Sequence, residues 1–105
     1  MGATVKHTPA NVEEARALLN GKSKLLICNS TYLVSGVNGD VFVEYHGNRI
    51  VSYTEHGIYA TWAGWGTSTT TTRLNQLCAA QFKIKGGEAY VDGEETRLNE
   101  WVKVG

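Results

Sequence analysis

The sequence changes character over residues 63–75, which read Ala63-Gly64-Trp65-Gly66-Thr67-Ser68-Thr69-Thr70-Thr71-Thr72-Arg73-Leu74-Asn75. Before this stretch, β-branched and aromatic residues alternate between short turn signals. After it, Leu74, Leu77 and Cys78 recur at helical spacing. A period of two is typical of strands and a period of 3.6 of helices. We therefore expect the stretch to join a β-rich half to a helix from about Thr70 to Ala80, capped by Thr69 or a neighbour.

Turn-forming residues divide the β-rich half into short strands. Asn38-Gly39 is typical of a hairpin turn, because Asn and Gly tolerate the positive φ that a type I′ turn needs. Gly47-Asn48 and Glu55-His56-Gly57 predict two more turns. The pattern predicts a meander of antiparallel strands, of which the first is kinked or bulged near Asn29. The expected strands cover residues 24–34, 41–46, 49–54 and 58–62.

Helix and hairpin signals also flank the meander. Asn11, with Glu14 three residues later, forms a capping-box pattern, and Gly21 follows as a C-cap, so we expect a helix over Asn11 to Asn20. Near the other end, Gly86-Gly87 predicts a closing hairpin, and residues 101–104 can add a last strand. Glu94-Glu95 has the composition of a solvated loop.

Length and patterning together predict the fold class. A chain of 105 residues is long enough for one core and too short for two ordinary domains. We expect a flexible N-terminus over residues 1–9 and a single α+β domain over residues 10–105. In that domain a twisted antiparallel β-meander is packed by one or two short helices.

Composition excludes several classes of function. Ten basic residues balance ten acidic ones, which argues against generic binding to nucleic acid or to an anionic membrane through bulk charge. No window approaches the roughly 18 apolar residues of a membrane span, and the N-terminus lacks a signal-peptide pattern. These features predict a cytoplasmic protein. Cys28 and Cys78 are flanked by apolar residues and are expected to be free thiols.

Residues 62–73 could form a site for an anion or a nucleotide. A helix N-terminus offers unpaired N–H groups and a partial positive charge, and the flanking glycines let backbone approach a ligand closely. A cation in the first helical turn opposes the helix dipole, and a nearby anion would relieve that conflict. Tryptophan rings can stack on a base. The candidate ligand-binding residues are Trp62, Trp65, Thr67, Thr69, Thr70 and Arg73.

A purely structural interpretation explains the same residues. In it Thr69 only caps the helix, Trp65 fills the core, and Arg73 pairs with a carboxylate of the protein itself. This interpretation is favoured, because neither a Walker-type lysine nor a dinucleotide fingerprint accompanies the stretch.

No motif for catalysis or metal binding is present. His7, His46 and His56 match no compact ligand spacing, and neither cysteine has a second ligand nearby in sequence, so no metal or cofactor is expected. No serine or cysteine lies in a nucleophile-elbow pattern. The sequence therefore leans towards a non-enzymatic protein.

Tyrosines and tryptophans are numerous for so small a sheet. An exposed aromatic face would suit a partner, a homodimer contact or single-stranded nucleic acid, and the alternative is that helices and the C-terminal tail cover it. Balanced charge weighs against nucleic acid. The aromatic set is Tyr32, Tyr45, Tyr53, Tyr59, Trp62 and Tyr90.

The chain resembles a family of small uncharacterised proteins of tailed bacteriophages over roughly Lys24 to Leu77. The resemblance rests on Asn29-Ser30-Thr31-Tyr32-Leu33, Val41-x-Val43-x-x-His46-Gly47-Asn48-x-Ile50-Val51, Gly57-x-Tyr59 and Ala63-Gly64-Trp65-x-Thr67-x-Thr69-Thr70-x-x-Arg73-Leu74-Asn75. It implies an accessory protein in the cytoplasm of an infected bacterium. Such a protein would bind a host protein or a small anionic ligand and so modulate host machinery or host defence. The alternatives are a small enzyme acting on a nucleotide or nucleic acid, or a virion protein.

Overall fold

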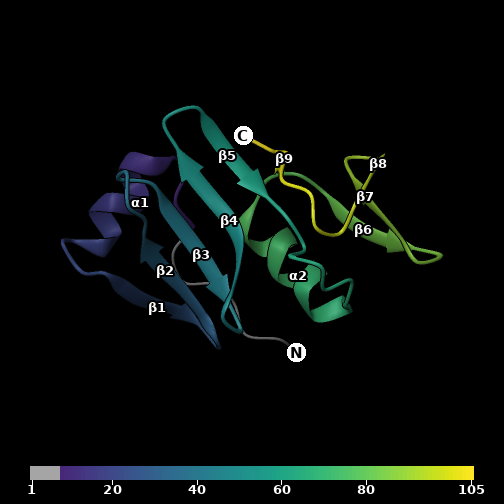
Figure 1. Ribbon diagram of the computed structural model, residues 1–105, viewed down its shortest axis with the longest axis horizontal. Coiled ribbons are helices and arrows are strands. Elements are labelled where there is room, and N and C mark those ends of the chain that lie inside the picture. Colours follow the sequence, from purple (N-terminus) through teal and green to yellow (C-terminus); the bar gives the residue numbers. More distant parts are fainter. Residues whose placement is uncertain (1–7) are drawn as a thin grey trace.

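Two antiparallel sheets and two helices make up the computed structural model, which describes residues 8–105. Most of the N-terminal segment that we expected to be flexible lies outside the described residues. The first sheet has six strands in the order β1-β2-β3-β4-β5-β9, and the second has three in the order β6-β7-β8. Figure 1 shows α2 between the two sheets, with α1 behind the first. The predicted α+β class is confirmed, but the β structure is divided between two sheets.

The six-stranded sheet is the predicted meander with one more hairpin. Its strands are β1 (Lys24–Cys28), β2 (Thr31–Ser35), β3 (Val41–Tyr45), β4 (Asn48–Thr54), β5 (Gly57–Ala60) and β9 (Val102–Lys103). The single kinked strand that we expected is wrong. Asn29 and Ser30 instead form a turn between β1 and β2, and Ser30 adopts φ 54° there. The irregularity lies between Leu26 and Cys28, where the register shifts.

The C-terminal segment is divided between the two sheets. β6 (Phe82–Lys85) and β7 (Glu88–Val91) form the predicted hairpin, with Gly86 and Gly87 at φ 60° and 83°. β8 (Glu94–Thr96) then pairs with β7, so the expected loop at Glu94-Glu95 is a strand. It follows a second left-handed pair, Asp92-Gly93, which turns the chain straight back. The predicted last strand is β9, which belongs to the six-stranded sheet and pairs with β5.

Both helices begin at a side-chain cap. α1 (Val12–Leu19) starts after Asn11, whose side chain accepts a hydrogen bond from the Glu14 N–H, and it ends at a left-handed Asn20. α2 (Ser68–Leu77) starts after Thr67, two residues earlier than the Thr69 cap that we expected. The position of the cap was predicted wrongly because every residue in the run 67–72 is a threonine or serine, and both residue types are preferred at the N-cap. Neither helix of residues 8–105 is long and apolar enough to cross a bilayer.

One core joins the helices to both sheets. The first face of the six-stranded sheet, the buried one, carries Leu33, Val41, Val43, Val51 and Tyr53. α1 adds three buried residues to this core, and Leu74 and Leu77 of α2 extend it to Phe82 and Val91 of the small sheet. Of the aromatic set, Tyr45, Tyr53 and Trp62 are buried, and Tyr32, Tyr59 and Tyr90 are partly exposed.

The Tyr53 hydroxyl is buried without a hydrogen-bond partner among the described residues. Burial raises the pKa of this hydroxyl well above its ordinary value, and the neighbouring Cys78 thiol adds to the shift. We expect Tyr53→Phe to raise the free energy of unfolding by about 1 kcal/mol, because it removes a desolvated polar group and keeps the ring. Urea denaturation of both proteins measures this change. A loss of stability would show that the hydroxyl is satisfied in solution.

Candidate functional site

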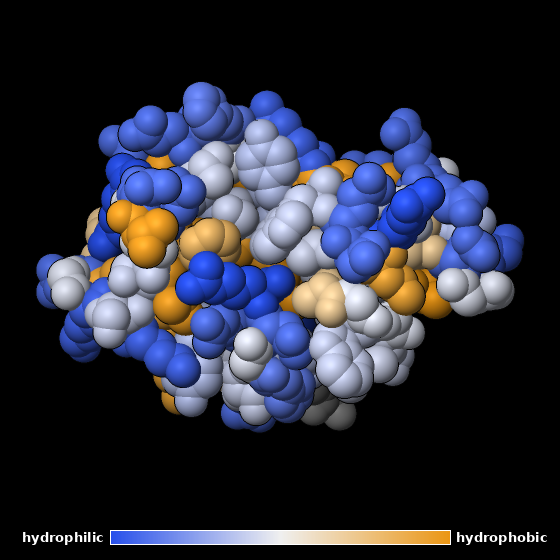
Figure 2. Space-filling view, viewed as in Figure 1, coloured by the Kyte–Doolittle hydropathy of each residue, from blue (hydrophilic) through white to orange (hydrophobic). Residues whose placement is uncertain are grey.

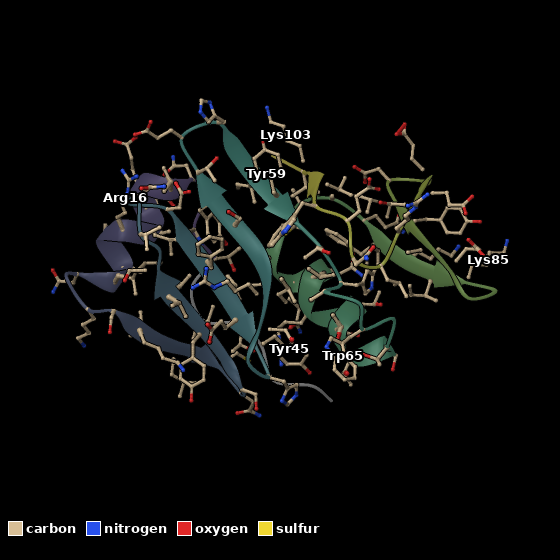
Figure 3. The ribbon with its side chains drawn as sticks, viewed as in Figure 1. Arg16, Tyr45, Tyr59, Trp65, Lys85 and Lys103 are labelled. Carbon is tan, nitrogen blue, oxygen red and sulfur yellow. The ribbon has the colours of Figure 1, made fainter. Side chains whose placement is uncertain are left out.

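A pocket of about 370 Å³ lies where the β3–β4 turn meets the start of α2. Two segments line it, residues 45–50 and residues 62–70, which are separate in the chain. Figure 3 shows Tyr45 and Trp65 near each other at this end of the molecule. The β3–β4 side contributes Tyr45, His46, Asn48 and Ile50, and the second side contributes Trp62, Trp65, Thr67, Thr69 and Thr70.

The start of α2 forms the polar wall of the pocket. Thr67 Oγ1 accepts a hydrogen bond from the Thr70 N–H at 3.2 Å and lies 3.0 Å from Thr70 Oγ1 and 3.2 Å from Thr69 Oγ1. The Thr71 hydroxyl donates to the Thr67 carbonyl at 2.8 Å. The helix dipole places partial positive charge at this end. The wall therefore offers hydroxyl groups beside the positive end of a helix.

The two predicted tryptophans have different roles. Trp65 leaves 56% of its surface exposed. It follows Ala63 and Gly64, both left-handed, and its N–H donates to the Trp62 carbonyl at 2.9 Å. The interpretation in which Trp65 fills the core is therefore wrong. Trp62 fills the core instead, with its Nε1–H donating to Thr71 Oγ1 at 2.9 Å and its ring edge-on to Phe82.

The opposite wall is held by a tight turn. His46 and Gly47 adopt φ 51° and 81°, as a two-residue turn of the I′ kind requires, and the His46 N–H donates to the Ser30 carbonyl at 3.0 Å. The turn thus lies one residue earlier than the Gly47-Asn48 turn that we expected. The Tyr45 and His46 rings lie with their centroids 4.3 Å apart. The turn brings an imidazole and a phenol into the lining of the pocket.

Arg73 does not line the pocket, although it was a candidate ligand residue. It is the sixth residue of α2 and so lies in the second turn. The argument that it opposes the helix dipole was therefore wrong, because that effect fades beyond the first turn. Arg73 Nη1 donates to Gln76 Oε1 at 2.6 Å and to Cys28 Sγ at 3.1 Å. Its guanidinium lies 5.4 Å from the centroid of the Tyr45 ring. Arg73 thus contacts a lining residue, Tyr45, without lining the pocket itself.

The structure thus unites five of the six predicted residues and adds four that the sequence did not indicate. The missed residues come from the β3–β4 turn and strand. His46 matched no metal-ligand spacing, and nothing local to the turn shows which other segment its side chain faces. The one sequence feature that could have indicated these residues is His46-Gly47-Asn48, which is part of the family resemblance.

The cysteines and the possible metal ligands of the described residues can be considered in turn. Burial raises the pKa of the Cys78 thiol to about 12, so it is a poor nucleophile at neutral pH. Cys28 and Cys78 form no disulfide bond. Within residues 8–105, no three His, Cys, Asp or Glu side chains come together in a group that could hold a metal ion.

Comparison with known proteins assigns the chain to a family. No curated protein and no solved structure matches it significantly. The family model described as the Kyanoviridae Gp96 protein matches residues 11–104. This match spans both helices and both sheets, which is wider than the resemblance seen in residues 24–77. The chain therefore belongs to the Kyanoviridae Gp96 protein family, a family of cyanophage proteins.

Proposed function

We propose that this phage protein acts by binding, and that the pocket beside Trp65 holds a small anionic ligand of nucleotide type in the host cytoplasm. One observation carries the proposal: an exposed indole and the start of a helix face the same cavity. A planar base can stack on the indole, while an anionic group meets the hydroxyls and the positive end of α2. By this means the protein would modulate host machinery or sequester a host defence signal.

The size and lining of the pocket suit such a ligand. Its volume of about 370 Å³ is near the lower end of the range of small-molecule sites, about 300–1,000 Å³. Tyr45, Ile50 and Trp62 supply an apolar floor, since all three are buried. A few polar groups then converge on one side. This combination is typical of sites that hold small molecules.

Trp65→Ala tests the pocket. Calorimetric titration with a panel of nucleoside mono-, di- and cyclic phosphates is expected to give saturable binding of at least one of them. Loss of the indole should weaken that binding by about tenfold or more, as loss of a base–aromatic stack does. Trp101→Ala is the matched control, because Trp101 is 43% exposed and lies outside the pocket lining.

Two results would contradict the ligand proposal. One is the absence of heat with every nucleotide, and the other is an equal loss of affinity in the Trp101→Ala control. Formation of a product at catalytic protein concentration would instead indicate the alternative, an enzyme acting on the nucleotide.

A host protein is the second candidate ligand at the same place. Exposed tryptophans are enriched among the residues that dominate protein interfaces, and Trp65 is the most exposed aromatic residue among the large hydrophobic ones. Affinity capture from infected cells should then enrich a partner with the wild type and with Trp101→Ala, but not with Trp65→Ala. Mass spectrometry of purified virions separates both proposals from a structural role.

A further inference from the structure

The second face of the six-stranded sheet, the one opposite α1, carries aromatic and basic side chains in two cross-strand rows. The strand register defines both rows. We call this surface the open face. Figure 2 views it and shows hydrophobic residues beside strongly hydrophilic ones over the strands. The long row is Lys24, Val34, Phe42, Ser52, Tyr59 and Lys103, and the short row is Leu26, Tyr32, Glu44 and Arg49.

Two cations on the open face already lie against aromatic rings. The Arg49 guanidinium lies 4.2 Å from the centroid of the Phe42 ring, and Lys24 Nζ lies 4.3 Å from that of Tyr32. The Glu44 carboxylate forms an ion pair with each cation, at 3.9 Å from Lys24 Nζ and 3.9 Å from Arg49 Nε. A guanidinium stacked in this way keeps its outer plane free for a base, because the ring covers only one side of it.

The charge of the open face differs from that of the whole chain. Three cations, Lys24, Arg49 and Lys103, lie on the strands of this face. All ten acidic residues of the chain lie within residues 8–105, and Glu44 is the only one of them on this face. Half of the acids, five, lie in residues 88–100, in and around the small sheet. Overall neutrality therefore masks a local excess of positive charge.

We infer that the open face binds single-stranded nucleic acid. Its three cations fit the phosphates of the backbone. Tyr59 and the stacked Arg49–Phe42 pair fit the faces of the bases. Sheets that expose aromatic rings bind unpaired bases in this manner, whereas a duplex keeps its base faces hidden. Across six strands at about 4.8 Å spacing the row is about 24 Å long, which is long enough for several nucleotides. The inference departs from the expectation drawn from bulk charge, and it does not depend on the pocket.

Fluorescence anisotropy with labelled oligo-dT and oligo-rU of about 12 nucleotides tests this inference, since that length lies within the range of about 4–16 nucleotides for single-strand sites. We expect saturable binding that weakens with salt. The triple variant Lys24→Gln, Arg49→Gln, Lys103→Gln should lose at least about tenfold in affinity. It should also flatten the slope of log K against log salt by about 2, since each lost cation removes about 0.7.

Matched controls distinguish binding at the open face from binding to positive charge elsewhere on the protein. Lys83→Gln with Lys85→Gln removes two exposed lysines from the small sheet and should leave the affinity nearly unchanged. Tyr59→Leu should weaken binding by about fivefold or more without altering the salt slope, because it removes stacking and no charge. Circular dichroism checks that each variant is folded, and all three cations of the triple variant are exposed.

Several outcomes would overturn the inference. They are no saturable binding of either oligonucleotide, equal binding of a duplex, or an equal loss in the Lys83 and Lys85 control. Equal binding of polyglutamate of the same charge would also overturn it, in favour of an acidic protein partner, because polyglutamate has no bases to stack. Trp65→Ala should bind the oligonucleotides like the wild type, because Trp65 lies outside the open face. If the open face binds no nucleic acid, the pocket proposal is therefore unaffected.

Discussion

Replacing Trp62 with alanine is expected to lower the free energy of unfolding by about 3–5 kcal/mol, the usual cost of deleting a buried tryptophan. Only 1% of Trp62 is exposed. Its ring meets Phe82 edge-on with centroids 5.5 Å apart, and its Nε1–H binds Thr71. The side chain thus touches α2 and the small sheet from the end of the meander. The whole free energy of unfolding of a native protein is only about 5–15 kcal/mol, so the variant should be close to unfolding.

Urea denaturation followed by circular dichroism measures this loss for Trp62→Ala. Trp101→Ala is again the control, and its loss should stay within about 1 kcal/mol because the side chain is largely exposed. An equal effect of the two substitutions would show that Trp62 does not join the two sheets.

The second large effect is expected from Asn75→Ala. The Asn75 side chain accepts from the Phe82 N–H at 2.7 Å and donates to the Phe82 carbonyl at 2.9 Å. It therefore ties the end of α2 to the first strand of the small sheet. Its removal leaves two groups of a buried residue without these bonds, at about 1–3 kcal/mol each. We expect a loss of about 2–6 kcal/mol in the free energy of unfolding for the two groups together.

Hydrogen exchange of the Phe82 amide, together with urea denaturation, measures the effect of Asn75→Ala. Exchange should quicken most in β6 and β7, because these strands lose their tie to α2. Asn99→Ala is a control at an exposed asparagine. Uniform quickening across both sheets, or no change at Phe82, would contradict the proposed link.

The helices and most turns were predictable because their signals are local. Asn11 and Glu14 are three residues apart, and the Gly86-Gly87 turn adopts the left-handed backbone that glycine favours. Element ends were less well predicted. In the threonine run, any of several hydroxyls can satisfy the helix N-terminus, so residue type alone does not show that Thr67 is the cap.

The candidate site could be predicted only in part. Trp65, Thr67, Thr69 and Thr70 are close in sequence, so their common location follows from chain connectivity. Tyr45 and His46 join them because β4 and β5 carry the chain back across the sheet, and no local pattern encodes that return. Arg73 is the opposite case. Because the helix starts two residues earlier than expected, Arg73 lies in its second turn and not its first, and its guanidinium donates to Cys28.

The sequence by itself determined the α+β class, the two helices, the meander and the stretch from Ala63 to Asn75 as the joint between β structure and helix. It could do so because period and turn chemistry act over a few residues. Only the tertiary structure decided that Trp62 is buried and Trp65 exposed, that β8 closes a second sheet, and that three of the ten basic residues share the open face. Those outcomes depend on strand register and on packing between distant segments, which a single sequence does not encode locally.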